Sequence, residues 1–184
     1  MTALSGKVLR IHQEDLCQSL GLPPHQKYQQ EGGPSAADAI NCIRTWSTTP
    51  VLDLTHFLDL LVFNVLIGNA DAHGKNFSWL YQNGARRIAP AYDFVATTLW
   101  PELSSRLAMR VGQAKFVAEV NLDHFLKFAE STRIGKTRFR ARIRELAMRV
   151  DQNLDETLNR APSLGPDHAD LLRTGIRERV RKLS

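Results

Sequence analysis

Four residues whose side chains could take part in catalysis lie within six positions, directly after a strongly apolar stretch. Asp71, His73, Lys75 and Asn76 follow the segment LVFNVLIGN and combine a carboxylate, an imidazole, an ammonium group and an amide. A carboxylate in such a position can take a proton from a hydroxyl group, and carboxylate and amide oxygens suit a hard cation such as Mg²⁺. The cluster therefore predicts a phosphoryl-transfer site.

The spacing of the acidic and amide residues follows the order used in protein kinases. In those enzymes an Asp of the catalytic loop accepts the hydroxyl proton, an Asn of the same loop binds magnesium, and a later Asp holds the metal ions against the triphosphate. Here Asp71 and Asn76 are five positions apart, and Asp93 follows a predicted hairpin. The hairpin should bring Asp93 alongside Asn76. We therefore predict Asp71 as the base, and Asn76 and Asp93 as magnesium ligands.

His73 and Lys75 lie between the base and the amide, where a cation would offset charge building on the transferred phosphoryl group. Other interpretations exist for each residue. His73 suits a packing role, Asp71 by itself suits a turn, and Asp93 suits a cap. A metal hydrolase using Asp71, His73 and Asp93 is a weaker alternative, because no further His or carboxylate stands at a recognisable ligand spacing. The agreement of three positions favours the kinase-like interpretation.

The elements that must position this cluster are mostly helical. Asp53 or Thr55 should cap a long apolar helix, LTHFLDLLVFNVLIG, which Gly68 should end. Before it, Ser35 and Asp38 should cap a helix over AADAINCIRTW.

After the cluster, FSWLY and RRIAPAY are strand-like runs joined by an Asn-Gly turn, which is a strong hairpin signal. We expect a mainly α fold with this one small hairpin. In the first segment, KVLRI suggests a brief strand, and EDLCQSLGL suggests about two helical turns. Three further helices are expected over 122–132, 136–159 and 167–182. A single domain would then comprise a leading segment, a catalytic core and C-terminal helices, over 1–34, 35–120 and 121–184.

Composition excludes some classes of protein and favours others. The net charge of +5 favours acidic partners such as nucleotide phosphates, nucleic acid or an acidic protein face. Cys17 and Cys42 have no CxxC spacing, so neither a zinc knuckle nor a redox dithiol is predicted. No continuous apolar run approaches the roughly 18 residues of a membrane span, and the N-terminus has no signal-peptide pattern. We expect a cytoplasmic protein without membrane association.

Several separated motifs together resemble one known family. LIGNADAHGKNFS and APAYDF resemble the HipA family, the kinase half of bacterial type II toxin–antitoxin pairs. LRIHQEDLCQSLGLPPHQKYQ, GGP and RLAM are also similar to segments of that family. The resemblance covers most of the chain in order.

The resemblance implies a two-lobed kinase-like fold, of which this chain is similar to the helical C-terminal lobe. It implies ATP and Mg²⁺ as cofactors and a protein Ser or Thr, for example on an aminoacyl-tRNA synthetase, as acceptor. It also implies a DNA-binding antitoxin as partner. By position it makes Asp71 the catalytic base and Asn76 and Asp93 the magnesium ligands. The residues that it implies for nucleotide binding are His73, Gly74, Lys75, Asn76, Tyr92 and Asp93.

Two departures from ordinary kinases qualify this expectation. Asp93 stands in Tyr-Asp-Phe-Val, without the Gly that follows Asp-Phe elsewhere, so the usual movement of that motif is not expected. No Gly-rich phosphate loop or strand-borne lysine precedes the cluster. We therefore expect a missing N-terminal lobe or split subunit to supply them, and weak or absent kinase activity of the chain by itself. The alternative function is a non-catalytic lobe that binds an antitoxin, a split partner chain or nucleic acid.

Overall fold

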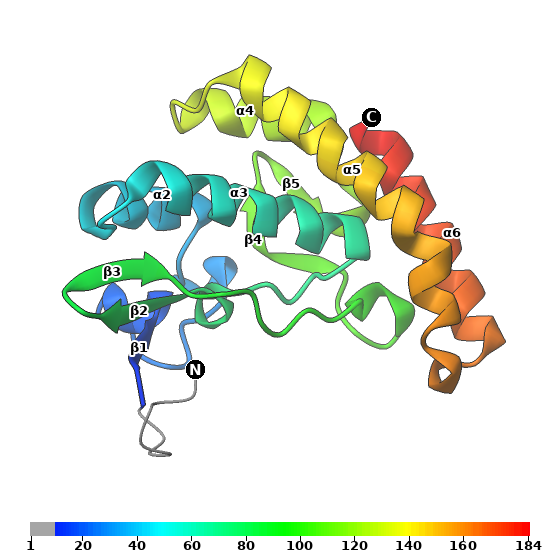
Figure 1. Cartoon of the computed structure of the whole chain (residues 1–184), viewed down its shortest axis with the longest axis horizontal. Helices are drawn as coiled ribbons and strands as arrows, with labels where there is room; N and C mark the ends of the chain where they lie inside the picture. Colours follow the sequence, from blue (N-terminus) through cyan, green and yellow to red (C-terminus); the bar gives the residue numbers. More distant parts are fainter. Residues whose placement is uncertain (1–9) are drawn as a thin grey trace.

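The computed structural model describes residues 10–184, and the candidate strand KVLRI lies mostly outside them. A central pair of helices separates a small sheet from three further helices (Figure 1). The helices are α1 (Leu16–Ser19), α2 (Ala36–Trp46), α3 (Pro50–Ile67), α4 (Leu122–Ser131), α5 (Lys136–Asn159) and α6 (Pro166–Leu183). The strands are β1 (His12–Asp15), β2 (Ser78–Gln82), β3 (Ala85–Ile88), β4 (Arg106–Val111) and β5 (Ala114–Phe116). The fold is thus mostly helical with small sheets, as expected.

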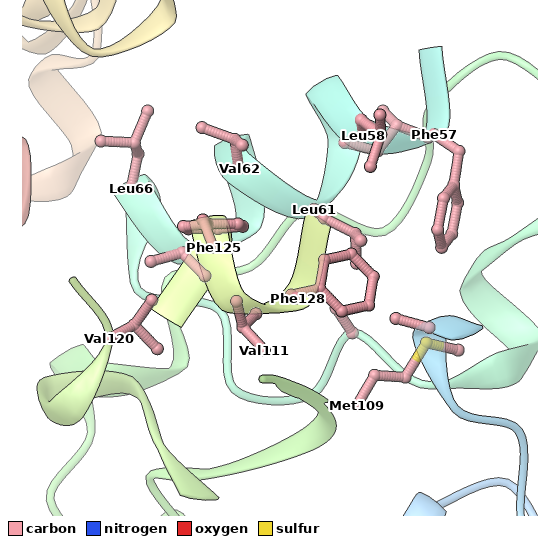
Figure 2. Close-up of a cluster of buried hydrophobic side chains, with 14 of the residues drawn as sticks. Phe57, Leu58, Leu61, Val62, Leu66, Met109, Val111, Val120, Phe125 and Phe128 are labelled. Atoms are coloured by element: carbon pink, nitrogen blue, oxygen red, sulfur yellow. The ribbon is translucent and has the colours of Figure 1, made fainter. Parts of the chain in front are cut away.

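Helix α3 is the core element against which most others pack. Its buried side chains include Phe57, Leu61 and Leu66, and they meet α4 residues such as Phe125 in one apolar cluster (Figure 2). Full burial of one such side chain stabilises a protein by about 1.5–3 kcal/mol. By length and composition alone, α3 also satisfies the criteria for a membrane span, as the only such helix within residues 10–184. Its contacts with α2, α5 and α6 are those of a core helix.

The start of α3 differs from the prediction and its end agrees with it. The helix begins at Pro50, whose ring favours the first helical position, so a cap at Asp53 or Thr55 is wrong. Asp53 instead lies buried in the first turn and accepts a hydrogen bond from Arg87 Nε at 2.9 Å. Gly68 ends the helix with φ of +81°, a conformation that favours glycine.

The predicted hairpin is formed by β2 and β3. Asn83 and Gly84 join the strands with φ values of +51° and +74°, which suit a tight turn matching the twist of the strands. Strand β1 adds to the other edge of β2 in antiparallel register, with Glu14 opposite Trp79. This third strand was not predicted. Asp15 then caps α1, which is one turn long rather than two.

A second hairpin, β4–β5, was also not predicted, because its strands are short and have no Asn-Gly turn. Strand β4 contains the RLAM segment. The backbone N–H of Ala108 donates to the carbonyl of Ala70 at 2.8 Å, so β4 is tied directly to the loop after α3.

The helices flanking the core agree well with the sequence pattern. Ser35 and Asp38 form a capping box at the start of α2, as predicted. Helix α5 has the bounds expected for it, and α6 begins at Pro166. Together α4, α5 and α6 cover the side of α3 that faces away from the three-stranded sheet (Figure 1).

Candidate active site

The loop after α3 is held by a buried asparagine that sequence reasoning missed. The side chain of Asn69 donates to Asn64 Oδ1 at 2.8 Å and accepts from the backbone N–H of Asp71 at 3.0 Å. Its amide nitrogen also lies 3.5 Å from the backbone carbonyl of Asp93. Asn69 therefore links the core helix to both halves of the predicted site. The available signal was a pair of asparagines inside an otherwise apolar stretch.

Thr97 holds the same loop from the opposite direction. Its buried hydroxyl accepts from the backbone N–H of Ala70 at 2.8 Å and donates to the carbonyl of Gly68 at 3.2 Å. Thr97 lies four positions after Asp93, so its bonds join the segment that carries Asp93 to the loop that carries Asp71. Nothing in the local sequence distinguishes Thr97 from Thr98.

Asp71 and His73 lie together at the start of the site. The Asp71 side chain is 50% exposed, which leaves its carboxylate open to an incoming group. His73 is buried, with Nε2 4.0 Å from Asp71 Oδ2, and its Nδ1 has no hydrogen-bond partner within the described chain. Burial lowers the pKa of His73, and the nearby Asp71 charge only partly opposes this. The imidazole is therefore neutral near pH 7, which disfavours the cationic role considered for it.

Asn76 and Asp93 meet across the β2–β3 hairpin, as predicted. The Asn76 amide nitrogen donates to Asp93 Oδ2, while its Oδ1 accepts from the backbone N–H of His73 at 2.9 Å. The chain at Asp93 has φ of +58°, so the carboxylate turns back toward the loop. Tyr92 reinforces this arrangement, because its hydroxyl donates to the carbonyl of Lys75 at 2.6 Å.

Lys75 and Gly74 complete the predicted set. The Lys75 ammonium group has no ion-pair or hydrogen-bond partner among the described residues, so its charge is available to a ligand. Gly74 is buried, and a Cβ atom there would lie 2.8 Å from both Cys17 Sγ and Pro34 Cγ. Only glycine fits at this point without a shift of the loop.

The oxygen donors fit Mg²⁺ of the kind that nucleotide-binding sites hold. Such an ion is bound by one or two protein oxygens together with phosphates and water. Asp93 supplies a carboxylate, and Asn76 Oδ1 retains a second lone pair beyond the one that accepts from His73, although the Asn76 nitrogen is the atom that meets Asp93. No cluster of three His, Cys, Asp or Glu side chains that could hold a metal ion occurs within residues 10–184.

Comparison with known proteins identifies the family. The family described as HipA-like C-terminal domain matches residues 3–154. The chain belongs to this family. The HipA-like chain is 45% identical over 141 residues to the predicted kinase Y4mE of Sinorhizobium fredii, covering 77% of this chain and 34% of that protein. It is 26% identical over 176 residues to the serine/threonine-protein kinase toxin HipA of Shewanella oneidensis, covering 90% of this chain and 41% of that protein.

A solved structure confirms the fold of the HipA-like chain. The complex of Shewanella oneidensis HipA with HipB and its operator DNA contains a chain that matches with a TM-score of 0.86 and 24% identity. The match covers 97% of this chain and 46% of that one. The HipA-like chain therefore spans between a third and a half of the length of these relatives.

Proposed function

We propose that this HipA-like chain is the helical C-terminal lobe of a kinase-like fold that transfers a phosphoryl group from ATP to a protein Ser or Thr. The contact between Asn76 and Asp93, with Asp71 on the same loop, is the observation that carries this proposal. Two named relatives, one a serine/threonine-protein kinase toxin and one a predicted kinase, support it. We further propose that the residues that bind the ATP phosphates belong to a separate lobe, corresponding to a part of the longer relatives that this chain does not match.

In this mechanism each residue of the loop has a separate task. Asp71 is half-exposed, so it can orient the acceptor hydroxyl and take up its proton. Asn76 and Asp93 would hold magnesium, which when bound neutralises charge on the phosphate oxygens. The unpaired Lys75 ammonium offsets the charge that develops on the transferred group. Tyr92 and Gly74 maintain the loop geometry through the contacts described above, and with neutral His73 they border the nucleotide.

A toxin–antitoxin role is the form of this proposal that the relatives favour. The structural neighbour is a HipA bound to HipB and operator DNA. We propose by extension that this chain acts in the cytoplasm with a DNA-binding antitoxin, and that its acceptor is a cellular protein such as an aminoacyl-tRNA synthetase. The alternative is a lobe that binds such partners without catalysis; it would still bind the antitoxin but would transfer no phosphoryl group.

The proposal is tested by phosphate transfer from labelled ATP, using the protein purified from its host with any chain that accompanies it. Asp71→Asn should reduce transfer at least hundredfold and retain Mg²⁺-dependent ATP binding, because a general base contributes about 10²–10⁴-fold. Asp93→Asn should lose that binding. Glu156→Gln, an exposed change on α5, is the matched control.

Three outcomes would count against parts of the proposal. Transfer within a few-fold of the parent in Asp71→Asn or Asp93→Asn would overturn the assigned roles. No transfer by the parent, with antitoxin binding intact, would establish the non-catalytic alternative. For the 184-residue chain by itself we expect little or no turnover, and a rate of about 1–100 s⁻¹, typical of kinases, would contradict that expectation.

A further inference from the structure

The segment that precedes α2 folds over the candidate catalytic loop, and backbone hydrogen bonds hold it there. The N–H of Gly74 donates to the carbonyl of Lys27 at 3.2 Å, and the N–H of Gly33 donates to the carbonyl of Tyr28 at 2.9 Å. The first bond joins positions almost fifty residues apart in the chain, and the second closes a turn within the segment itself. Lys27 and Tyr28 are therefore fixed beside the loop by their own backbone.

Close packing prevents this segment from shifting. A Cβ atom at Gly33 would lie 2.7 Å from the Gln26 carbonyl oxygen and 2.8 Å from the Tyr28 nitrogen. At Gly74 a Cβ atom would meet Pro34 Cγ at 2.8 Å. Both approaches are closer than a side chain permits, so the backbone of the segment lies directly against its neighbours. The backbone positions from which the side chains of Lys27 and Tyr28 extend are consequently fixed.

The Tyr28 side chain joins the group formed by Asp71 and His73. Its ring meets the His73 imidazole edge-on, with centroids 5.5 Å apart and an interplanar angle of 72°. Lys27 Nζ lies over the Tyr28 ring, 4.9 Å from its centre. Partial burial raises the pKa of Tyr28, and the nearby Asp71 carboxylate raises it further, as expected where a phenol lies close to a carboxylate. Lys27 opposes this effect.

The Asp71 carboxylate needs a partner of this kind. His73 Nε2 is 4.0 Å away, which is too far for a hydrogen bond. A half-exposed carboxylate without a firm contact samples several rotamers, and misplacement of a catalytic group by about 1 Å can cost about a hundredfold in rate. The half-buried Tyr28 phenol, held against His73, can supply a donor in a fixed position.

We propose that Tyr28 is a positioning residue of the kinase site: its hydroxyl donates to the Asp71 carboxylate and selects the orientation in which Asp71 receives the acceptor hydroxyl. Lys27, which lies over the ring, limits the movement of Tyr28. This inference rests on the proposed kinase function, but contact between Tyr28 and Asp71 can be measured without turnover.

The contact is tested without catalysis by NMR of the 184-residue chain labelled at the tyrosine ζ-carbons. Tyr28→Phe assigns the Tyr28 resonance among the three tyrosines. Asp71→Asn should shift that resonance and lower the pKa of Tyr28, because removal of the negative charge favours tyrosinate. Glu14→Gln is the matched control, since Glu14 accepts from Tyr81 at 2.6 Å and should leave Tyr28 unchanged. An unchanged Tyr28 resonance and pKa in Asp71→Asn would overturn the proposal.

The positioning role is tested by kinetics on the native protein with its accompanying chain. Tyr28→Phe keeps the ring against His73 and should lower kcat about tenfold while the KM for ATP stays constant. A kcat within twofold of the parent, or a KM that rises in proportion, would refute positioning. Absence of transfer by the parent would instead reject the kinase function, and the NMR measurement would still decide whether Tyr28 contacts Asp71.

Discussion

The Asn76 side chain donates a hydrogen bond to the Asp93 carboxylate across 17 positions of the chain. The two residues meet because the β2–β3 hairpin brings the chain back to the loop. The Tyr92 hydroxyl stabilises this arrangement by donating a hydrogen bond to the Lys75 carbonyl at 2.6 Å. The Asn76 amide and the Asp93 carboxylate are therefore adjacent before any ligand is bound, with the Asn76 nitrogen toward Asp93 and its oxygen toward the His73 N–H. Such preorganisation reduces the free-energy cost of placing them when a metal and nucleotide arrive.

The backbone at Asp93 predicts an unusual order of stability among its variants. With φ of +58°, an alanine there is strained by about 1 kcal/mol relative to glycine, whereas asparagine tolerates this region well. We expect Asp93→Ala to unfold at lower urea concentration than Asp93→Gly or Asp93→Asn. Asp123, in the first turn of α4, provides the comparison, because glycine should be the less stable substitution in a helix. The same order at both positions would contradict a left-handed Asp93.

The buried carboxylate of Asp53 should be a strong stabilising contact outside the site. It is 1% exposed and binds Arg87 Nε at 2.9 Å and Ser47 Oγ at 2.5 Å, thereby linking α3 to the hairpin. Asp53→Asn should lower the free energy of unfolding by about 2 kcal/mol, less than the 3–5 of a fully buried pair because the Arg87 side chain retains 43% exposure.

Urea unfolding of Asp53→Asn checks this value, with Glu156→Gln as the control. Glu156 pairs with Arg160 on the surface of α5, where both side chains are at least 75% exposed, so its loss should not be measurable. Equal stabilities of the two variants would show that the Asp53 pair contributes no more than a surface pair.

Glu119 should make the free energy of unfolding fall as the solution becomes acidic. Its carboxylate accepts from the backbone N–H groups of Lys115 and Phe116 at 2.7 and 3.2 Å, and these bonds lower the pKa of Glu119 below its ordinary value of 4.5. The unfolded chain therefore binds the proton more readily than the folded one. The stabilisation is complete above about pH 4.5 and is lost as the pH falls through the lowered pKa.

Unfolding free energies of the parent and of Glu119→Gln at pH 6 and pH 3.5 test this dependence. The difference between the two proteins should be larger at pH 6 than at pH 3.5. Glu102→Gln, a change at an exposed residue before β4, should give no such pattern. A Glu119→Gln effect that is constant with pH would show that the backbone bonds do not depend on the charge.

Gly74 should be coupled to Cys17. The Cβ atom of Gly74→Ala would lie 2.8 Å from Cys17 Sγ, and overpacking of this kind costs about 1–3 kcal/mol. Removal of the sulfur in Cys17→Ala should relieve part of that cost, so the double variant should be more stable than the sum of the single changes indicates. Gly135→Ala, where nothing lies within 4 Å, is the control. Additive effects in the double-mutant cycle would contradict the contact.

Whether the sequence predicted an element correctly depends on how far apart in the chain the residues that stabilise it lie. The end of α3 at Gly68, the Asn83-Gly84 hairpin and the bounds of α5 depend on neighbours in the chain, and their prediction is confirmed. The start of α3 was wrong because Asp53, a good cap by type, is drawn into the core by Arg87. Strand β1 was missed because its partner β2 lies far along the chain, and the β4–β5 hairpin because its strands are short and have no Asn-Gly turn.

For the candidate site, the sequence by itself determined which residues to examine: the spacing of Asp71, Asn76 and Asp93 predicts a base and two magnesium ligands. The contact between Asn76 and Asp93 followed from a turn that local residues specify. Only the tertiary structure decided that Asn69 and Thr97 hold the loop and that the Tyr28 ring packs against His73. Those relationships join residues far apart in the chain, and they depend on burial and packing, which act on the folded molecule and leave no local pattern.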